Sequence, residues 1–373
     1  MTATSPVPDF TALVRAFPLA GRLVSATPHG SGHINDTYAV AFEESGRGVR
    51  YLLQRVNPRV FADIPALMDN IARVTRHAAA RAAGHPDGAR RALALVPATD
   101  GRPYHRDPDG GWWRCYHFIE RARSYDVVET PAHAAAAARA FGEFQRLLVD
   151  LPGTRLHETI PGFHDTRRRF LAFQRSLAAD AHGRAAGARA EIAFALQREP
   201  LVDVLLDLQA SGAVPERVTH NDAKFNNVML DTSTHEALCV VDLDTVMPGL
   251  ALNDFGDLVR SATNAAAEDE RALGRVRARP EIFAALAEGY LASAGAFLTA
   301  AEVEHLAVSG QVITFEQGLR FLTDHLAGDT YYKIRRPGHN LERAANQFAL
   351  VRSLEAQRAA MESLVRRLAS LRT

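Results

Sequence analysis

The chain has 373 residues, of which 47% are hydrophobic and 23% charged, and Lys plus Arg balances Asp plus Glu at 43 each. This length predicts two domains or lobes, and the zero formal net charge argues against a dedicated binder of nucleic acid or anionic membrane. Two distant cysteines imply no disulfide framework, and no signal peptide or bilayer-length apolar run is evident, so a cytoplasmic location is expected.

The first third of the chain is expected to form a small β-sheet. Short runs rich in β-branched and aromatic residues alternate there with Gly-containing turn sequences. A helical segment from about Ile64 to Ala83 interrupts the series. The expected strands are 21–30, 36–44, 48–56, 91–98 and 111–119, and the clearest turns are GSG at 30–32 and ESGRG at 44–48.

Beyond Glu120 the pattern becomes helical, with Ala-rich and Arg-rich segments of helical periodicity. One island, from Val218 to Thr245, is expected to form a loop, a strand, a turn and a second strand. The sequence therefore predicts an α+β protein with a strand-rich part, 1–120, and a larger, mostly helical part, 121–373. The expected helices are about 131–150, 164–181, 185–211, 279–295, 300–327 and 340–371.

The island carries the residues most indicative of chemistry. Asp222 lies in its loop, Asn227 begins the strand NVML, DTSTHE supplies a turn, and the returning strand ALCVVDL ends near Asp242. In an antiparallel hairpin the start of one strand lies beside the end of the other, so Asn227 and Asp242 should converge. An amide oxygen and a carboxylate suit Mg²⁺, and the separate Asp222 suits a base in phosphoryl transfer. Asp244 is either a second metal ligand or a support for the loop.

These stretches also carry a family resemblance. H-x-D-x-x-x-x-N, followed by a strand ending in Asp, resembles the aminoglycoside and choline phosphotransferases, the small-molecule branch of the protein-kinase-like fold. GSGHINDTY, YLLQRVN, HNDAKFNNVMLD, CVVDLDTVMPG, DFGDLVR and LRFLTDHLAGDTYYK together are similar to N-acetylhexosamine 1-kinases, over roughly residues 24–350. The resemblance implies a two-lobed fold, with a small antiparallel β N-lobe that binds nucleotide and a helical C-lobe that holds the catalytic loop and the acceptor.

The resemblance further implies particular roles. Asp222 matches the catalytic carboxylate, and Asn227 and Asp242 match the metal ligands. His220 matches the histidine that braces the loop. Lys224 matches a lysine that touches the transferring phosphate, with a solvated surface lysine as the alternative reading. ATP and Mg²⁺ are the cofactors implied, and no obligate protein partner is evident.

The nucleotide end departs from the family pattern. GSG at 30–32 lies between two strands, where glycines let backbone N–H groups approach phosphate. Kinases usually carry a Lys on the third strand, but YLLQRVN places Gln54 there, with Arg55 as the nearest cation on the opposite strand face. Either Arg55 reaches in from a bulge, or Gln54 serves as a neutral donor and Lys224 supplies the charge. The hinge matches FIERARSYD, whose backbone would meet adenine. The nucleotide candidates are Gly30, Ser31, Gly32, Gln54, Arg55 and Glu120.

The acceptor is expected on the helical lobe, within reach of Asp222. In LRFLTDHLAGDTYYK the helix should end near Gly328, which leaves DTYYK as a loop over the site. Resemblance to the hexosamine kinases implies Arg320 and Tyr331 as sugar contacts, with His33 nearby. Arg320 and Asp324 are also spaced as a surface ion pair, i to i+4.

The sequence therefore favours an ATP- and Mg²⁺-dependent kinase that phosphorylates the anomeric hydroxyl of an N-acetylhexosamine or related hexose. A second hypothesis keeps the kinase and changes the acceptor to an aminoglycoside, choline, homoserine or a thioribose. A third is a nucleotide-binding pseudokinase, which only the missing strand lysine supports.

Overall fold

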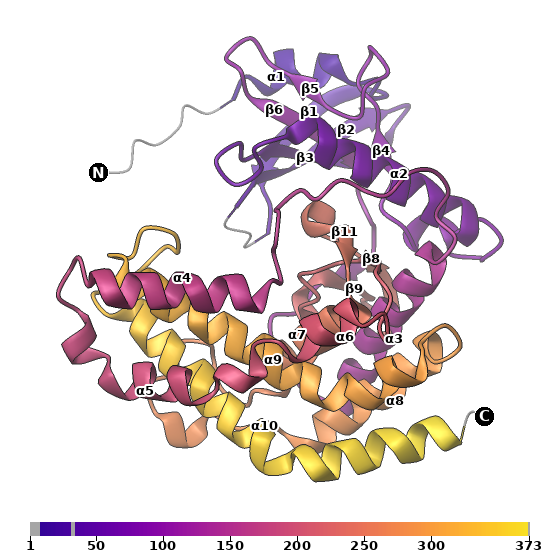
Figure 1. The fold of residues 1–373 in the computed structure, drawn as a ribbon. Helices are drawn as coiled ribbons and strands as arrows, with labels where there is room; N and C mark the ends of the chain where they lie inside the picture. The colour runs from indigo at the N-terminus through magenta and orange to yellow at the C-terminus, as the bar shows by residue number, and fades with distance from the viewer. Residues whose placement is uncertain (1–7, 31–33, 372–373) are drawn as a thin grey trace.

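The structure, a computed structural model, describes residues 8–30 and 34–371 and has two lobes (Figure 1). An antiparallel sheet with one long helix forms the N-terminal lobe, and helices dominate the C-terminal lobe. This is the expected α+β, kinase-like architecture. The division at residue 120 stays a prediction.

The sheet of the N-terminal lobe has the strand order β1-β2-β3-β6-β4, with β5 paired to β6. Every pairing in it is antiparallel. Its outer face buries Leu53 and Trp113 with residues of the N-terminal segment, and its inner face turns toward α2 and the other lobe. The elements are α1 (Phe10–Leu13), β1 (Arg22–Pro28), β2 (Asp36–Glu44), β3 (Arg47–Val56), α2 (Ile64–Ala82), β4 (Leu95–Val96), β5 (His105–Arg106) and β6 (Trp112–His117).

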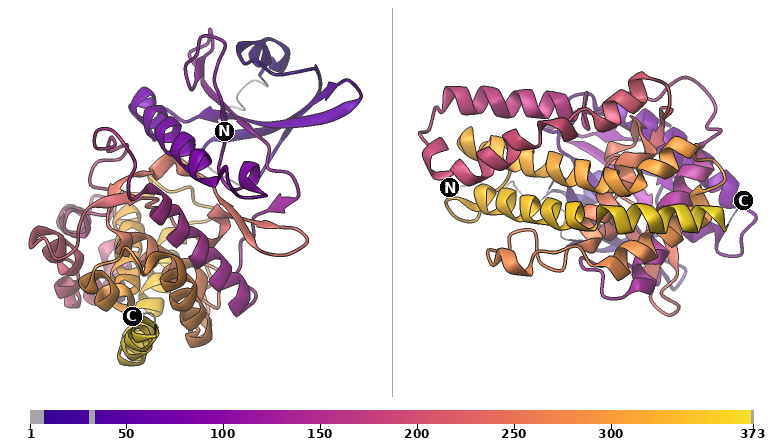
Figure 2. Two further views of the ribbon diagram at one scale, coloured as in Figure 1. Left: turned by 90° about the vertical axis from the view of Figure 1, so that its right-hand side faces the viewer. Right: turned by 60° about the horizontal axis from the view of Figure 1, so that its bottom comes forward.

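The C-terminal lobe is organised around α9, which packs along α10, α7 and α4 (Figure 2). A Thr299–Glu302 capping box begins α9. Helix α7 lies so close to α9 that a Cβ on Gly256 would come 2.6 Å from the Ser309 carbonyl oxygen. The helices are α3 (Pro131–Leu148), α4 (Thr166–Ala179), α5 (Arg189–Gln197), α6 (Val204–Ala210), α7 (Ala251–Thr263), α8 (Pro280–Ala294), α9 (Ala300–Leu326) and α10 (His339–Ser370).

Two small antiparallel sheets lie where the lobes meet (Figure 1). One has the order β10-β9-β7 and contains the expected hairpin, and the other pairs β11 with β8. Among the described residues no helix is long and apolar enough to cross a membrane. The strands are β7 (Ala122–Arg123), β8 (Arg217–Thr219), β9 (Val228–Asp231), β10 (Ala237–Val240) and β11 (Met247–Gly249).

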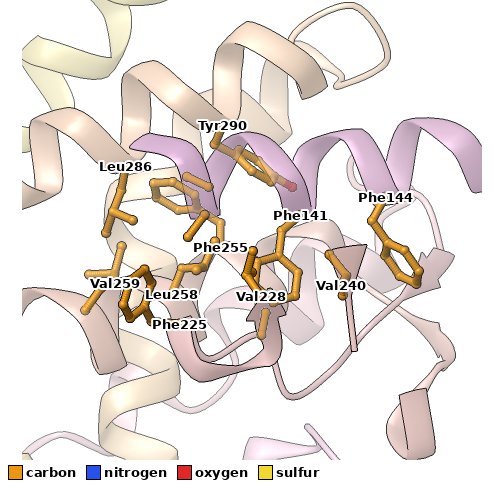
Figure 3. Packing of buried hydrophobic residues seen from close by; sticks show 14 of the residues in the cluster. Phe141, Phe144, Phe225, Val228, Val240, Phe255, Leu258, Val259, Leu286 and Tyr290 are labelled. Atoms are coloured by element: carbon orange, nitrogen blue, oxygen red, sulfur yellow. The ribbon is translucent and has the colours of Figure 1, made fainter. Parts of the chain in front are cut away.

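An aromatic core packs against the hairpin (Figure 3). Phe141 from α3 and Phe255 from α7 are fully buried there, and Val228 of β9 packs in the same cluster. Burying each large apolar side chain contributes roughly 1.5–3 kcal/mol. The hairpin therefore stands on a packed base shared by three helices and cannot shift without disturbing this core.

Helix α7 is not among the expected helices, and three expected elements end or break differently in the structure. The expected helix 185–211 is broken between α5 and α6, because Pro200 cannot continue a helix and forces a short 3-10 turn. The expected strand 91–98 shrinks to β4. The expected strand ALCVVDL ends at Val240, because Asp242 has left-handed backbone angles that end the extended run.

Candidate active site

The loop after β8 is held in an unusual shape by buried hydrogen bonds. Asn221 has a left-handed backbone with φ 63°, which a non-glycine residue adopts only when its surroundings enforce it. The buried Asp254 carboxylate of α7 accepts from the backbone N–H of His220 at 2.9 Å and of Asn221 at 2.7 Å. Gln145 donates to the same carboxylate at 2.6 Å. Asp254 therefore anchors the loop just before Asp222.

His220 braces this loop, in the position that the resemblance implies. Its imidazole is fully buried against the edges of Phe141 and Phe144, and Nε2 lies 2.9 Å from the Val241 carbonyl oxygen. Its Nδ1 accepts from the Asp222 backbone N–H at 3.3 Å. The ring thus ties the loop to the far end of the hairpin.

A second support reaches the loop from the helical lobe, and sequence reasoning did not find it. The His164 Nε2 lies 2.9 Å from the Asn221 carbonyl oxygen, and its Nδ1 lies 2.8 Å from the Glu316 carboxylate of α9. Burial alone would lower the pKa of His164, but the Glu316 charge raises it above the ordinary value. A protonated His164 is therefore favoured, with a hydrogen to donate on each nitrogen.

Asp222 projects from the braced loop beside a lysine. The Lys224 Nζ lies 3.0 Å from Asp222 Oδ2, and both side chains are partly exposed. Burial would raise the pKa of Asp222, but the Lys224 charge outweighs it and holds that pKa below the ordinary value. The Asp222 charge in turn raises the pKa of Lys224. Both groups are therefore charged at neutral pH, the carboxylate as a base and the ammonium as a cation.

Asn227 and Asp242 lie at neighbouring ends of the hairpin. The Val241 N–H donates to the Asn227 carbonyl at 2.9 Å, which places the residue after Val241 beside Asn227. The Asn227 Nδ2 donates to the Asp222 carbonyl at 2.8 Å, which turns its Oδ1 away from the loop. Desolvation of the carboxylate, and then the charges of Asp244 and Asp222, raise the pKa of Asp242 to about 6.

These groups fit a magnesium ion. An amide oxygen and a carboxylate suit a hard cation that completes its shell with water and phosphate. After desolvation, the neighbouring charges of Asp244 and Asp222 contribute to the raised pKa of Asp242, and a bound cation would offset them. In the described part of the chain no three His, Cys, Asp or Glu side chains are arranged to hold a metal by themselves. Phosphate oxygens would supply the ligands that the protein lacks.

Asp244 supports the lobe contact. Its side chain is buried, Oδ1 pairs with the Arg114 guanidinium of β6, and Oδ2 accepts from Asn35 Nδ2 at 2.6 Å. Both partners belong to the N-terminal lobe. Of the two roles left open by the sequence, loop support matches these contacts, because both carboxylate oxygens are already engaged.

The nucleotide candidates separate into two groups. Gln54 lies on the inner face of β3, bonded to Thr37 and Arg114, whereas the Arg55 guanidinium lies 6.0 Å from the Trp113 ring on the outer face. Arg55 therefore points away from the face of β3 that carries Gln54. Gly30 has a left-handed φ of 77°, and Ser31, Gly32 and His33 lie outside the described residues.

Glu120 lies between the lobes, but its side chain is occupied by Arg50, whose Nε donates to it at 2.9 Å. Its carbonyl accepts from Arg90 at 3.1 Å, and the next carbonyl, of Arg121, accepts from the Thr232 N–H at 3.0 Å. Adenine recognition is therefore expected to use the remaining backbone groups of this segment.

On the acceptor side, Arg320 lies between two aromatic rings. Its guanidinium carbon is 5.2 Å from the Phe163 ring centre and 5.7 Å from that of Tyr332. Tyr331, in the loop after α9, is 65% exposed, and its contact with a sugar stays a prediction. Within the described ranges Arg320 forms no ion pair with Asp324, which instead accepts from the backbone N–H groups of 330–332 and shapes that loop.

Arg169 of α4 is a second acceptor-side cation, and sequence reasoning missed it. It donates to the Phe163 carbonyl at 2.9 Å, and its buried Nε has no hydrogen-bond partner. Burial, then the charge of nearby Arg320, lowers the pKa of Arg169. Among the described carboxylates none pairs with either arginine, and nearby Glu316 is bonded to His164 and Thr166. Neither guanidinium therefore has a direct ion pair among the described residues, although the Glu316 charge acts on both.

Comparison with known proteins finds a matching family model and several similar solved structures. The profile of the family described as "Phosphotransferase enzyme family" (APH) matches residues 25–300. An aminoglycoside phosphotransferase from Alicyclobacillus acidocaldarius superposes with a TM-score of 0.60 at 15% identity, over 98% of both chains. A choline kinase from Cryptosporidium parvum gives 0.56 at 13% over 96% and 97%, and the ADP-bound aminoglycoside phosphotransferase APH(2'')-Ib gives 0.50 at 11% over 92% and 98%.

Proposed function

The chain belongs to the phosphotransferase enzyme family, and on that premise we propose that it transfers the γ-phosphoryl group of ATP, with Mg²⁺, to the anomeric hydroxyl of an N-acetylhexosamine or a related hexose. The observation that carries the proposal is the ionised Asp222, paired with Lys224 beside the converging Asn227 and Asp242. This arrangement supplies a base, a cation and two metal ligands.

The chemistry follows from these groups. Asp222 orients the acceptor hydroxyl and accepts its proton as the new oxygen–phosphorus bond forms and the bond to the ADP oxygen breaks. An anomeric hydroxyl is more acidic than an ordinary alcohol, so one carboxylate base suffices. The Lys224 ammonium stabilises negative charge on the transferring group. Asn227 and Asp242 would hold Mg²⁺, which when bound neutralises phosphate charge.

The charges on the acceptor side favour a sugar over a cationic acceptor. An aminoglycoside or choline requires carboxylates or aromatic faces aimed at its positive charge. Here Arg169 and Arg320 present guanidinium donors without a described acidic partner, and Glu316 is already committed to His164. Guanidinium N–H groups are suitable donors to the hydroxyl and carbonyl oxygens of an N-acetylhexosamine. Arg320 and Tyr331 are the proposed sugar contacts, and His33 stays a prediction.

An acceptor panel tests the proposal. The protein is incubated with ATP, Mg²⁺ and either N-acetylglucosamine, N-acetylgalactosamine, choline, homoserine, a thioribose or an aminoglycoside. ADP release and the phosphorylated product are then measured. We expect a hexosamine 1-phosphate, and none with Asp222→Asn, which should still bind ADP. Turnover only on another alcohol would refute the substrate, and no turnover on any acceptor would favour the pseudokinase hypothesis.

A further inference from the structure

The N-terminal lobe lacks the lysine that kinases place on the strand equivalent to β3, and a different cation stands opposite that position. Gln54 is paired in register with Arg114 of the adjacent strand β6. Residues directly opposite on neighbouring antiparallel strands project from the same face, with their Cβ atoms about 4.5–5.5 Å apart. The side chain of Arg114 therefore leaves the sheet close to position 54, on the same face as a lysine at that position would.

Three contacts fix where that guanidinium points. Its Nε donates to Gln54 Oε1 at 2.9 Å, and Gln54 is held in turn by donating to Thr37 Oγ1 at 3.0 Å. Its Nη1 pairs with Asp244 across the lobe boundary. The side chain is 2% exposed and that of Asp244 is 6% exposed. Gln54 thus orients the Arg114 guanidinium toward the C-terminal lobe without adding a charge.

The Arg114 guanidinium lies where the nucleotide phosphates are expected to bind. Asp244 stands two residues from the proposed metal ligand Asp242, and it also binds Asn35, at the end of the glycine-rich loop. Among the described residues the second terminal nitrogen of Arg114, Nη2, has no hydrogen-bond partner. A guanidinium has five N–H donors in a planar fork, so one arginine can hold Asp244 and a phosphate oxygen together.

The other nearby cations do not reach this place. Arg55 lies on the outer face over Trp113, and Lys224 is bonded to Asp222 on the acceptor side of the metal ligands. The one acid of α2, Asp69, is half exposed and pairs with Arg73 and His157, and the buried polar residues of this helix are Asn70 and Thr75. In the described part of α2 no acid therefore takes the place of the usual kinase glutamate. The usual Lys–Glu pair is replaced as a unit.

We propose that Arg114 binds the α- and β-phosphates of the nucleotide, replacing the absent strand lysine, while Asp244 and Gln54 hold its guanidinium in place. The inference rests on the proposed kinase function and names the residue that completes its nucleotide site. A buried ion pair by itself adds little net stability, because desolvation offsets the attraction. A phosphate-binding role would explain the buried Arg114–Asp244 pair by function and not by stability alone.

Binding of adenosine, AMP and ADP, measured by calorimetry without acceptor, tests the proposal. In Arg114→Gln we expect adenosine affinity to be unchanged and ADP affinity to fall about ten- to hundredfold, the loss expected for hydrogen bonds to a charged group. Gln54→Lys/Arg114→Gln should recover most of the ADP affinity, because it returns a cation to β3. Arg22→Gln, an exposed arginine of β1 paired with Glu43, is the control.

A structural role predicts a different pattern. If Arg114 only joins the lobes, Arg114→Gln should weaken adenosine and ADP equally, Gln54→Lys should not rescue, and the proposal is overturned. Arg114→Gln/Asp244→Asn removes both charges of the pair, so it tests phosphate binding without an unpaired buried carboxylate; unchanged ADP affinity there also overturns the proposal. ADP binding that depends on Arg114 without turnover on any alcohol would uphold the inference and reject the kinase activity.

Discussion

Replacing Asp254 should separate the support of the catalytic loop from its chemistry. This buried carboxylate accepts from the backbone N–H groups of His220 and Asn221 and from the Gln145 side chain. Asp254→Ala leaves three buried donors unpaired, the two backbone N–H groups and the Gln145 Nε2, although Gln145 Oε1 still accepts from Tyr290. Each unpaired donor costs about 1–3 kcal/mol.

One effect opposes this cost. Burial raises the pKa of Asp254, which means that its charged form carries a desolvation cost in the folded protein. A neutral replacement removes that cost. We therefore expect Asp254→Ala to lose about 2–4 kcal/mol of unfolding free energy. Asp254→Asn should lose less, about 1–2 kcal/mol, because its amide oxygen still accepts while its NH₂ group faces a single N–H.

Urea denaturation and steady-state kinetics measure the two consequences. Because Asp222 follows the anchored residues directly, loosening the loop should also lower kcat by tenfold or more, as misplacement of a reacting group by about 1 Å costs up to 10²-fold. Glu143→Ala on the exposed face of α3 is the control and should change stability by less than about 0.5 kcal/mol. Wild-type stability and kcat in Asp254→Ala would refute the anchoring role.

Four further outcomes are expected. Asp222→Asn should lower kcat about 10²- to 10⁴-fold with ADP affinity retained, and a loss of less than tenfold would exclude it as the base. With the pKa of Asp242 near 6, Mg²⁺-dependent ADP affinity should fall by up to about tenfold per pH unit below pH 6, and this fall should vanish in Asp242→Asn. Because that folded-state pKa is raised, stability of the metal-free protein is present at low pH and is lost as pH rises through about 6, so Asp242→Asn should raise Tm at pH 7.5. Arg169→Gln should raise the acceptor KM while leaving the ATP KM unchanged; equal changes in both would show that Arg169 acts on the fold instead.

The contacts of Asp244 join the two lobes through polar groups. Asn35 from the glycine-rich loop and Arg114 from β6 converge on this one carboxylate of the metal-binding segment. A movement of the N-terminal lobe away from the C-terminal lobe would have to separate a buried ion pair and leave its charges in need of water. In the proposed role of Arg114, a nucleotide phosphate would bind its guanidinium in addition to Asp244.

Local sequence determined the framework of the protein. Alternation and turn chemistry located the strands of the first lobe, because a half-buried strand exposes every second residue. The spacing from Asp222 to Asn227 and on to Asp242 located the hairpin, since an antiparallel return brings its two ends together. Left-handed backbone at Asn221 and Asp242 has no such local signature, because packing enforces it against the preference of the residue type.

Tertiary structure decided which distant residues serve the site. Arg114 gave no signal in sequence, because its role depends on pairing with Gln54 across two strands and with Asp244 130 residues away. His164 and Arg169 likewise gave no signal in sequence, because their neighbours Glu316 and Arg320 come from the distant helix α9. A motif records residues that one local segment holds together, whereas charge balance at a site is summed over every element that reaches it.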